Sequence, residues 1–245
     1  MARVTGTVER EPGTTTWRRA ARWSWCQLRL LVDVRANPAT FVYLFTLFVT
    51  TVVIGATGTR LTTALLQSQS TNLTNLRHDP LHVLFTSAFW LPEGYQLILL
   101  VIPFAIVLAP AERWLGTWRW LVVFVTGHVG ASLLTAVIIW AELERQMTSA
   151  SLTRTVDVGA SYGLVAILGV LTYRVPTHWR VPYLVAVLGV IAVGMIAGPT
   201  FTDIGHVIAF GIGLACRSLV PRTSPAAAVH GETDPALGAT TTRQG

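Results

Sequence analysis

Six long apolar segments occupy most of the chain, and they decide what it can fold into. A helix needs about 20 apolar residues to cross the hydrocarbon core of a bilayer. Only 12% of the 245 residues are charged, whereas about a quarter of the residues of a soluble domain are charged. We therefore predict an all-α, polytopic membrane protein with a bundle of six transmembrane helices, at residues 40–58, 96–111, 118–141, 157–173, 181–198 and 201–220.

Arginine is the basic residue throughout the chain, and its distribution predicts the orientation in the membrane. Fourteen of the 18 arginines lie before the first segment, after the second and fourth segments or at the C-terminus, and four lie in the opposite loops. Because cytoplasmic loops carry an excess of basic residues, both termini are predicted to be cytoplasmic. We expect an integral protein of the plasma (inner) membrane, whose net charge of +6 needs no nucleic-acid partner.

The chain divides into three predicted regions. Residues 1–38 form a basic, aromatic leader, which is either a helix lying on anionic lipid or a solvated topology signal. Residues 39–220 form the membrane domain, in which 59–95 either close over the site as a lid or only cover the outer surface. Residues 221–245 lack periodicity and are predicted to be disordered. We find no internal repeat typical of a transporter, and we predict no metal site and no cofactor.

Polar residues occur at matching depth in the fourth and sixth segments. Ser161 follows Asp157 by four residues, and His206 follows Asp203 by three. If both helices run inward from the outer face, both side chains lie about 5–8 Å below that boundary at 1.5 Å per residue. A histidine within hydrogen-bond reach is the usual base that activates a serine, so these residues form a candidate dyad. The alternative is that Ser161 packs between helices and that His206, like His128 in the third segment, is structural.

Small residues recur every four positions in the sixth segment, at Gly205, Ala209 and Gly213. Such a face lets the backbones of two membrane helices touch. His206 lies beside this face, so its imidazole is expected to point toward the neighbouring helix. Gly159 is expected either on a packing face of the fourth helix or in the turn that precedes it.

These features resemble the rhomboid family of intramembrane serine proteases over roughly residues 80–220. The resemblance implies a rhomboid-like fold in which Ser161 is the nucleophile and His206 is its general base. It also implies a single-span membrane protein as the substrate or client, with cleavage near the outer membrane face. The motifs that carry it are DPLHVLFTSAF at 79–89, ERWLG at 112–116, GAS at 159–161 and GHVIAFGIG at 205–213.

Departures from the family pattern bear on the predicted activity. The family's His-x-x-x-Asn, which supplies donors to the oxyanion, aligns with Gln96 and Leu100, so Gln96 and Gly159 are the remaining supporting residues. Losing one oxyanion donor costs about 10²–10³ in rate. Tyr162 stands where a second glycine is usual, and Val165 stands where an aromatic residue stacks on the histidine. The sequence favours a serine endopeptidase or a pseudoprotease that binds transmembrane helices without cutting them. A small transporter or channel is the third function considered; six spans with His128 and His206 inside the membrane permit it, but the chain shows no repeat symmetry and no mid-span acidic residue to couple ions.

Overall fold

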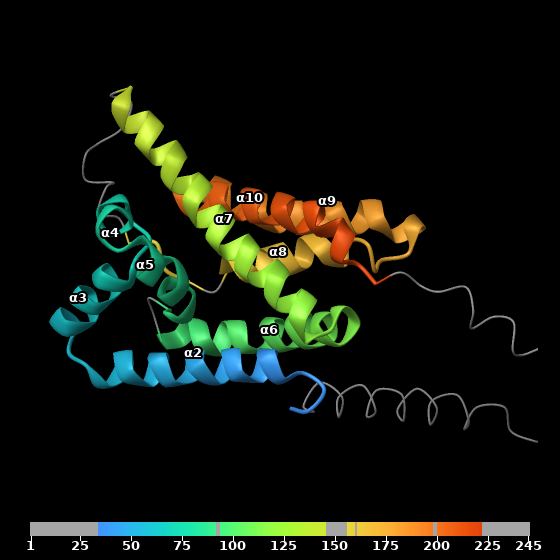
Figure 1. Cartoon of the computed structure of the whole chain (residues 1–245), viewed down its shortest axis with the longest axis horizontal. Helices are drawn as coiled ribbons and strands as arrows, with labels where there is room; N and C mark the ends of the chain where they lie inside the picture. The colour runs from blue at the N-terminus through green and yellow to red at the C-terminus, as the bar shows by residue number, and fades with distance from the viewer. Residues whose placement is uncertain (1–33, 92–93, 146–155, 160, 198–199, 222–245) are drawn as a thin grey trace, which may run out of the picture.

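A computed structural model describes residues 34–91, 94–145, 156–159, 161–197 and 200–221. Most of the predicted leader and of the predicted tail lies outside these ranges. All elements within them are helices, and six of these coincide with the predicted apolar segments (Figure 1). The six are α2 (Pro38–Ala56), α6 (Gly94–Leu115), α7 (Thr117–Glu144), α8 (Ser161–Leu171), α9 (Thr177–Ala197) and α10 (Phe201–Ala215).

Within the described residues, three of these helices, α2, α7 and α9, are long and apolar enough to cross a membrane. Helix α2 buries Tyr43 and Leu47 against the protein, while Val42, Phe45 and Phe48 are exposed. A large exposed apolar surface of this kind marks a face that contacts lipid or another apolar partner. The chain is therefore an integral membrane protein, and the number of six spanning helices stays a prediction.

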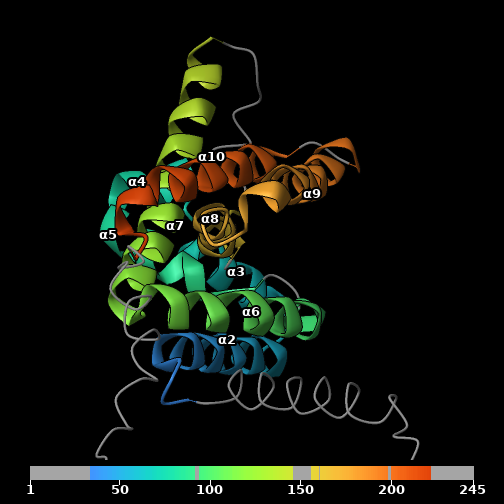
Figure 2. The same cartoon turned by 90° about the vertical axis from the view of Figure 1, so that its right-hand side faces the viewer.

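Helix α8 lies at the centre of the bundle. Figure 2 views it nearly end-on, and it contacts α6, α7 and α10. The backbones of α8 and α10 touch, because a Cβ atom on Gly213 would overlap the backbone of Ala166. Gly169 lies in the same way against the carbonyl of Phe210. Helix α9 packs on α10 at the periphery, and most of its surface is exposed.

Glu112 of the ERWLG motif fixes the start of α2. The carboxylate is buried, and it accepts hydrogen bonds from the backbone N–H groups of Ala39 at 3.0 Å and Thr40 at 2.8 Å. The hydroxyl of Thr117 also donates to it, at 2.8 Å. The first N–H groups of a helix have no partner within that helix, so this carboxylate supplies one from a different helix. Glu112 thereby ties α2 to the junction of α6 and α7.

Helix α8 is the shortest of the six, and it begins later than the sequence predicted. It has 11 residues and starts at Ser161, whereas the apolar segment was predicted from residue 157. Its length of about 16 Å is half of the ~30 Å hydrocarbon core. Residues 156–159 are not helical, and Gly159 has a φ of 145°, which L side chains rarely adopt. Irregular backbone at membrane depth is tolerated only where protein covers it or it lines a cavity.

The segment between α2 and α6 provides that cover. It contains α3 (Thr59–Gln69), α4 (Leu73–His78), α5 (Pro80–Thr86) and the short helix η1 (Ser87–Phe89). These elements lie at the end of the bundle where α8 begins (Figure 1). Several hydrogen bonds join this segment to the stretch before α8. Asp157 N–H donates to Ser70 Oγ at 2.7 Å, and Gly159 N–H donates to Ser87 O at 3.0 Å. The N–H and the hydroxyl of Thr71 both donate to Asp157 O at 3.0 Å.

Candidate functional site

Ser161 and His206 lie near the starts of two helices that run in parallel. Ser161 is the first residue of α8, and His206 lies in the second turn of α10. Gly205 packs against Tyr162 near these starts, and the contact made by Gly213 follows further along both helices. Both starts therefore lie at the same end of the bundle, under α3–α5 (Figure 1).

The residues one turn after Ser161 and His206 belong to the same cluster of buried side chains. Residues four apart lie on one face of a helix, so Val165 follows Ser161 and Phe210 follows His206. Val165 and Phe210 belong to one hydrophobic cluster with Ala131 of α7 and Ile191 of α9. Within the described part of the chain, no hydrogen bond joins the two side chains.

Tyr162 supplies the aromatic contact to the histidine. Its ring meets that of His206 edge-on, with 5.4 Å between the centroids, and lies 6.1 Å from that of His128. Its hydroxyl donates to the carboxylate of Asp157 at 3.3 Å. The family pattern places the aromatic at the position of Val165, one turn further along. In this chain the aromatic ring that contacts the imidazole of His206 therefore comes from Tyr162, the residue next to Ser161, and not from position 165.

A small space beside Ser161 is lined by polar side chains from separate elements. Thr71 comes from the covering segment, His128 and Ser132 from α7, and Asp157 from the stretch before α8. The space is too narrow in this conformation to hold a water molecule. A substrate carbonyl could reach Ser161 from this side only after the surrounding side chains move.

His128 has a partner in the covering segment. One ring nitrogen, Nε2, lies 3.0 Å from Ser87 Oγ, and both side chains are buried. The carbonyl of Ser87 accepts the N–H of Gly159, as described above. His128 therefore connects α7 to the turn before α8, which agrees with its interpretation as a structural residue.

The predicted supporting residues are placed only in part. Gly159 lies in the turn that precedes α8. Gln96 and Leu100 lie in the first two turns of α6, which packs against α8, but their side chains are outside the described part of the structure. Across the described ranges, no three His, Cys, Asp or Glu side chains gather as metal ligands would.

A family model described as "Rhomboid-like protein" matches residues 32–226, which is most of the chain. The chain belongs to the rhomboid-like protein family. No curated protein and no solved structure matches it. The family match to this rhomboid-like protein runs from α2 through α10 and so includes both helices that carry the candidate dyad.

The close packing of Gly205 on Tyr162 gives a first test of the site in this rhomboid-like protein. A Cβ atom at Gly205 would overlap the tyrosine ring, so Gly205→Ala is expected to lower the free energy of unfolding by about 1–3 kcal/mol. Gly211 in the same helix has open space around it, and Gly211→Ala is the matched control. Thermal unfolding in detergent would measure both. Equal melting temperatures for the two variants would contradict the packing described here.

Proposed function

We propose that this rhomboid-like protein is an intramembrane serine endopeptidase, with Ser161 as the nucleophile and His206 as the general base. The observation that carries the proposal is the contact between the His206 ring and Tyr162, the residue next to Ser161. A weakly nucleophilic serine is activated by a neighbouring base. Hydrogen bonds between such groups are often long without substrate and shorten in the substrate complex, so the missing bond is compatible with catalysis.

The chemistry follows from these two side chains. As Ser161 Oγ attacks the substrate carbonyl carbon, a ring nitrogen of His206 takes the hydroxyl proton. The peptide C–N bond then breaks, the proton passes to the leaving amine, and an ester to Ser161 remains. Water attacks this ester while His206 again accepts a proton and returns it to the serine oxygen, which releases the carboxylic acid. The backbone N–H of Ser161, at the start of α8, is the proposed main-chain donor to the oxyanion, and Gln96 is the proposed side-chain donor.

The proposed substrate is a single-span membrane protein that is cleaved near the outer face of the plasma membrane. In this proposal all six apolar segments cross the bilayer, the fourth as α8 together with the non-helical residues before it, and both termini are cytoplasmic. The arginine distribution supports this orientation. The shortness of α8 supports a site below the membrane surface, because a helix of 11 residues reaches across only about half of the hydrocarbon core.

A second candidate function is that of a pseudoprotease, which binds transmembrane helices without cutting them. Two observations favour it. Leu100 cannot donate the hydrogen bond that the family's asparagine provides. The space beside Ser161 also has no room for a water molecule in this conformation.

Labelling with a fluorophosphonate probe separates the two candidates. We expect the purified full-length protein to be labelled, and Ser161→Ala to abolish the labelling, because the probe reacts only with an activated serine oxygen. Ser132→Ala is the matched control, since Ser132 lines the same small space from α7. In-gel fluorescence, followed by mass spectrometry of the labelled peptide, would measure the result.

Folded wild-type protein that takes up no probe would overturn the protease proposal and favour the pseudoprotease. Equal labelling of wild type and Ser161→Ala would show that another residue reacts. Circular dichroism of each preparation provides the check on folding.

A further inference from the structure

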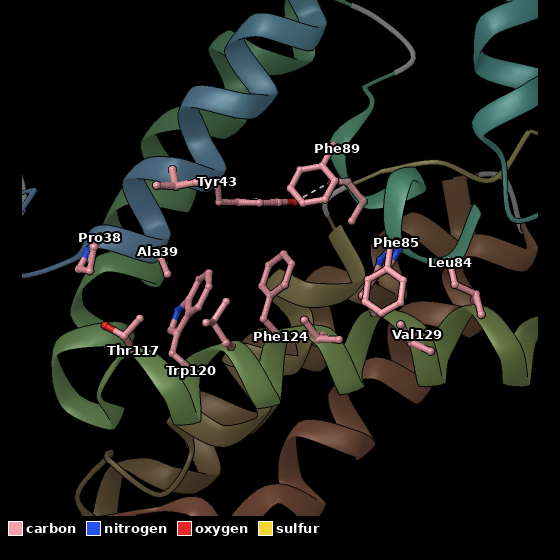
Figure 3. Close-up of a pocket in the computed structure, with 15 residues that line it drawn as sticks. Pro38, Ala39, Tyr43, Leu84, Phe85, Phe89, Thr117, Trp120, Phe124 and Val129 are labelled. Atoms are coloured by element: carbon pink, nitrogen blue, oxygen red, sulfur yellow. Dashed lines mark hydrogen bonds between the residues drawn. The ribbon is translucent and has the colours of Figure 1, made fainter. Parts of the chain in front are cut away.

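An apolar groove runs along the side of the bundle, and none of the residues that line it belongs to α8 or α10. It lies between α2, α7 and the α5–η1 segment, and it encloses about 360 Å³. Figure 3 shows Trp120 and Phe124 of α7 facing Tyr43 of α2, with Phe85 and Phe89 on the third wall. This volume falls within the range of about 300–1,000 Å³ that is typical of ligand pockets. We call this feature the lateral groove.

The lateral groove presents almost nothing but carbon to an occupant. Two hydroxyls on its walls are bonded elsewhere: that of Tyr43 donates to the carbonyl of Ala88 at 2.9 Å, and that of Thr117 donates to Glu112 at 2.8 Å. Nε2 of His128, at the far end, is paired with Ser87 Oγ. Among the described residues, Trp120 Nε1 and His128 Nδ1 have no hydrogen-bond partner, but both atoms are buried and offer almost no surface to an occupant. The groove therefore suits an apolar chain.

The length of the lateral groove matches half of a bilayer. Its wall on α7 runs from Thr117 to Val129, which are 12 residues apart. At 1.5 Å per residue this is about 18 Å, while one leaflet contributes about 15 Å to the ~30 Å hydrocarbon core. An extended acyl chain of one leaflet has this length. Since α2 and α7 are both long and apolar enough to span the membrane, the groove between them lies at the depth of the lipid tails.

The walls favour a flexible chain over a partner helix. Interfaces between membrane helices are rich in glycine, alanine and serine, which allow backbones to approach. The lateral groove is instead walled mainly by large aromatic and branched side chains. We propose that it binds one acyl chain of a membrane lipid. This binding site is independent of whether the protein cleaves substrates.

Occupancy of the lateral groove bears on the turn before α8. The α5–η1 wall contains Ala88 and Phe89, and it continues into Ser87. Ser87 contacts His128 through its side chain and Gly159 through its carbonyl. An acyl chain between α2, α7 and this wall therefore supports the residue that holds the turn in place. The lipid would act as a structural ligand next to the site.

Photo-crosslinking tests the proposal on the full-length protein. The protein is reconstituted in palmitoyl-oleoyl phosphatidylcholine vesicles that contain a phosphatidylcholine with a diazirine on one acyl chain. We expect adducts on Ala88 and Phe124, which are only 4% and 5% exposed and which bulk lipid cannot reach. Val125→Phe, which fills the groove, is expected to lose these adducts. Val185→Phe on the exposed face of α9 is the matched control and is expected to keep them.

Two results would overturn the proposal. The first is wild-type protein with adducts on the exposed face of α9 but none on Ala88 or Phe124; this result does not depend on the folding of any variant. The second is equal labelling of Ala88 and Phe124 in wild type, Val125→Phe and Val185→Phe, because a filled groove cannot admit the chain.

Discussion

Replacing His206 with glutamine is expected to slow the acylation of Ser161 by about 10²–10⁴-fold, which is the usual contribution of a general base. Glutamine fills much of the same space beside Tyr162, but its amide cannot accept the serine proton at neutral pH. The measurement is the second-order rate constant for labelling by the fluorophosphonate probe. A loss of this size in a folded variant would assign the base.

His178→Gln is the matched control for this experiment. His178 is exposed on α9 and lies against Trp179, and nothing in the described structure places it near Ser161. Its replacement is expected to leave the labelling rate unchanged. If His206→Gln reacts as fast as wild type, His206 is not the base. His128, the other histidine beside Tyr162, would then be the next residue to replace.

The positions of the helices could be predicted from the sequence because long apolar runs have few alternatives in a membrane. A helix occupies most of each of the six predicted segments. The start of α8 could not be predicted in the same way, because residues 157–160 are as compatible with a helix start as with a turn. The non-helical stretch before α8 is held by hydrogen bonds that join Asp157 and Gly159 to Ser70, Thr71 and Ser87. These partners are 72–87 residues away along the chain.

In the candidate site, too, features set by neighbouring residues could be predicted, and contacts between distant residues could not. The shared depth of Ser161 and His206 followed from counting residues along two helices. The role of Tyr162 did not, because its ring contacts His206, a residue 44 positions further along the chain. Gly205 gave part of the signal: its small side chain predicted a close helix contact, and the structure places the Tyr162 ring there.

The sequence left open whether residues 59–95 form a lid over the site or only cover the outer surface. Residues 59–89 bind the turn before α8 through hydrogen bonds of both main chain and side chain. Thr71 alone donates to Asp157 through its N–H and its hydroxyl, both at 3.0 Å. The segment is thus hydrogen-bonded to the stretch before α8 and does not only cover it. Access of water or substrate to Ser161 from that side requires these bonds to rearrange.

Leu100→Asn is expected to raise the rate of acylation of Ser161 by up to about 10²–10³-fold. By resemblance, this position supplies a side-chain donor to the oxyanion in the rhomboid family, and leucine has none to offer. An asparagine amide would stabilise the negative charge that develops on the attacked group. Position 100 lies one turn after Gln96 on α6, so the variant restores the family's spacing of two donors. The labelling rate constant is again the measurement.

Leu99→Asn is the control for this gain, because it adds the same polar group about 100° around the helix. The increase should be absent in Leu99→Asn, and it should vanish when Ser161→Ala is added to Leu100→Asn. Equal rates in wild type and folded Leu100→Asn would mean that the lost donor does not limit the reaction. A rise that requires Ser161 would show that the nucleophile is competent and that the missing donor at position 100 limits its acylation.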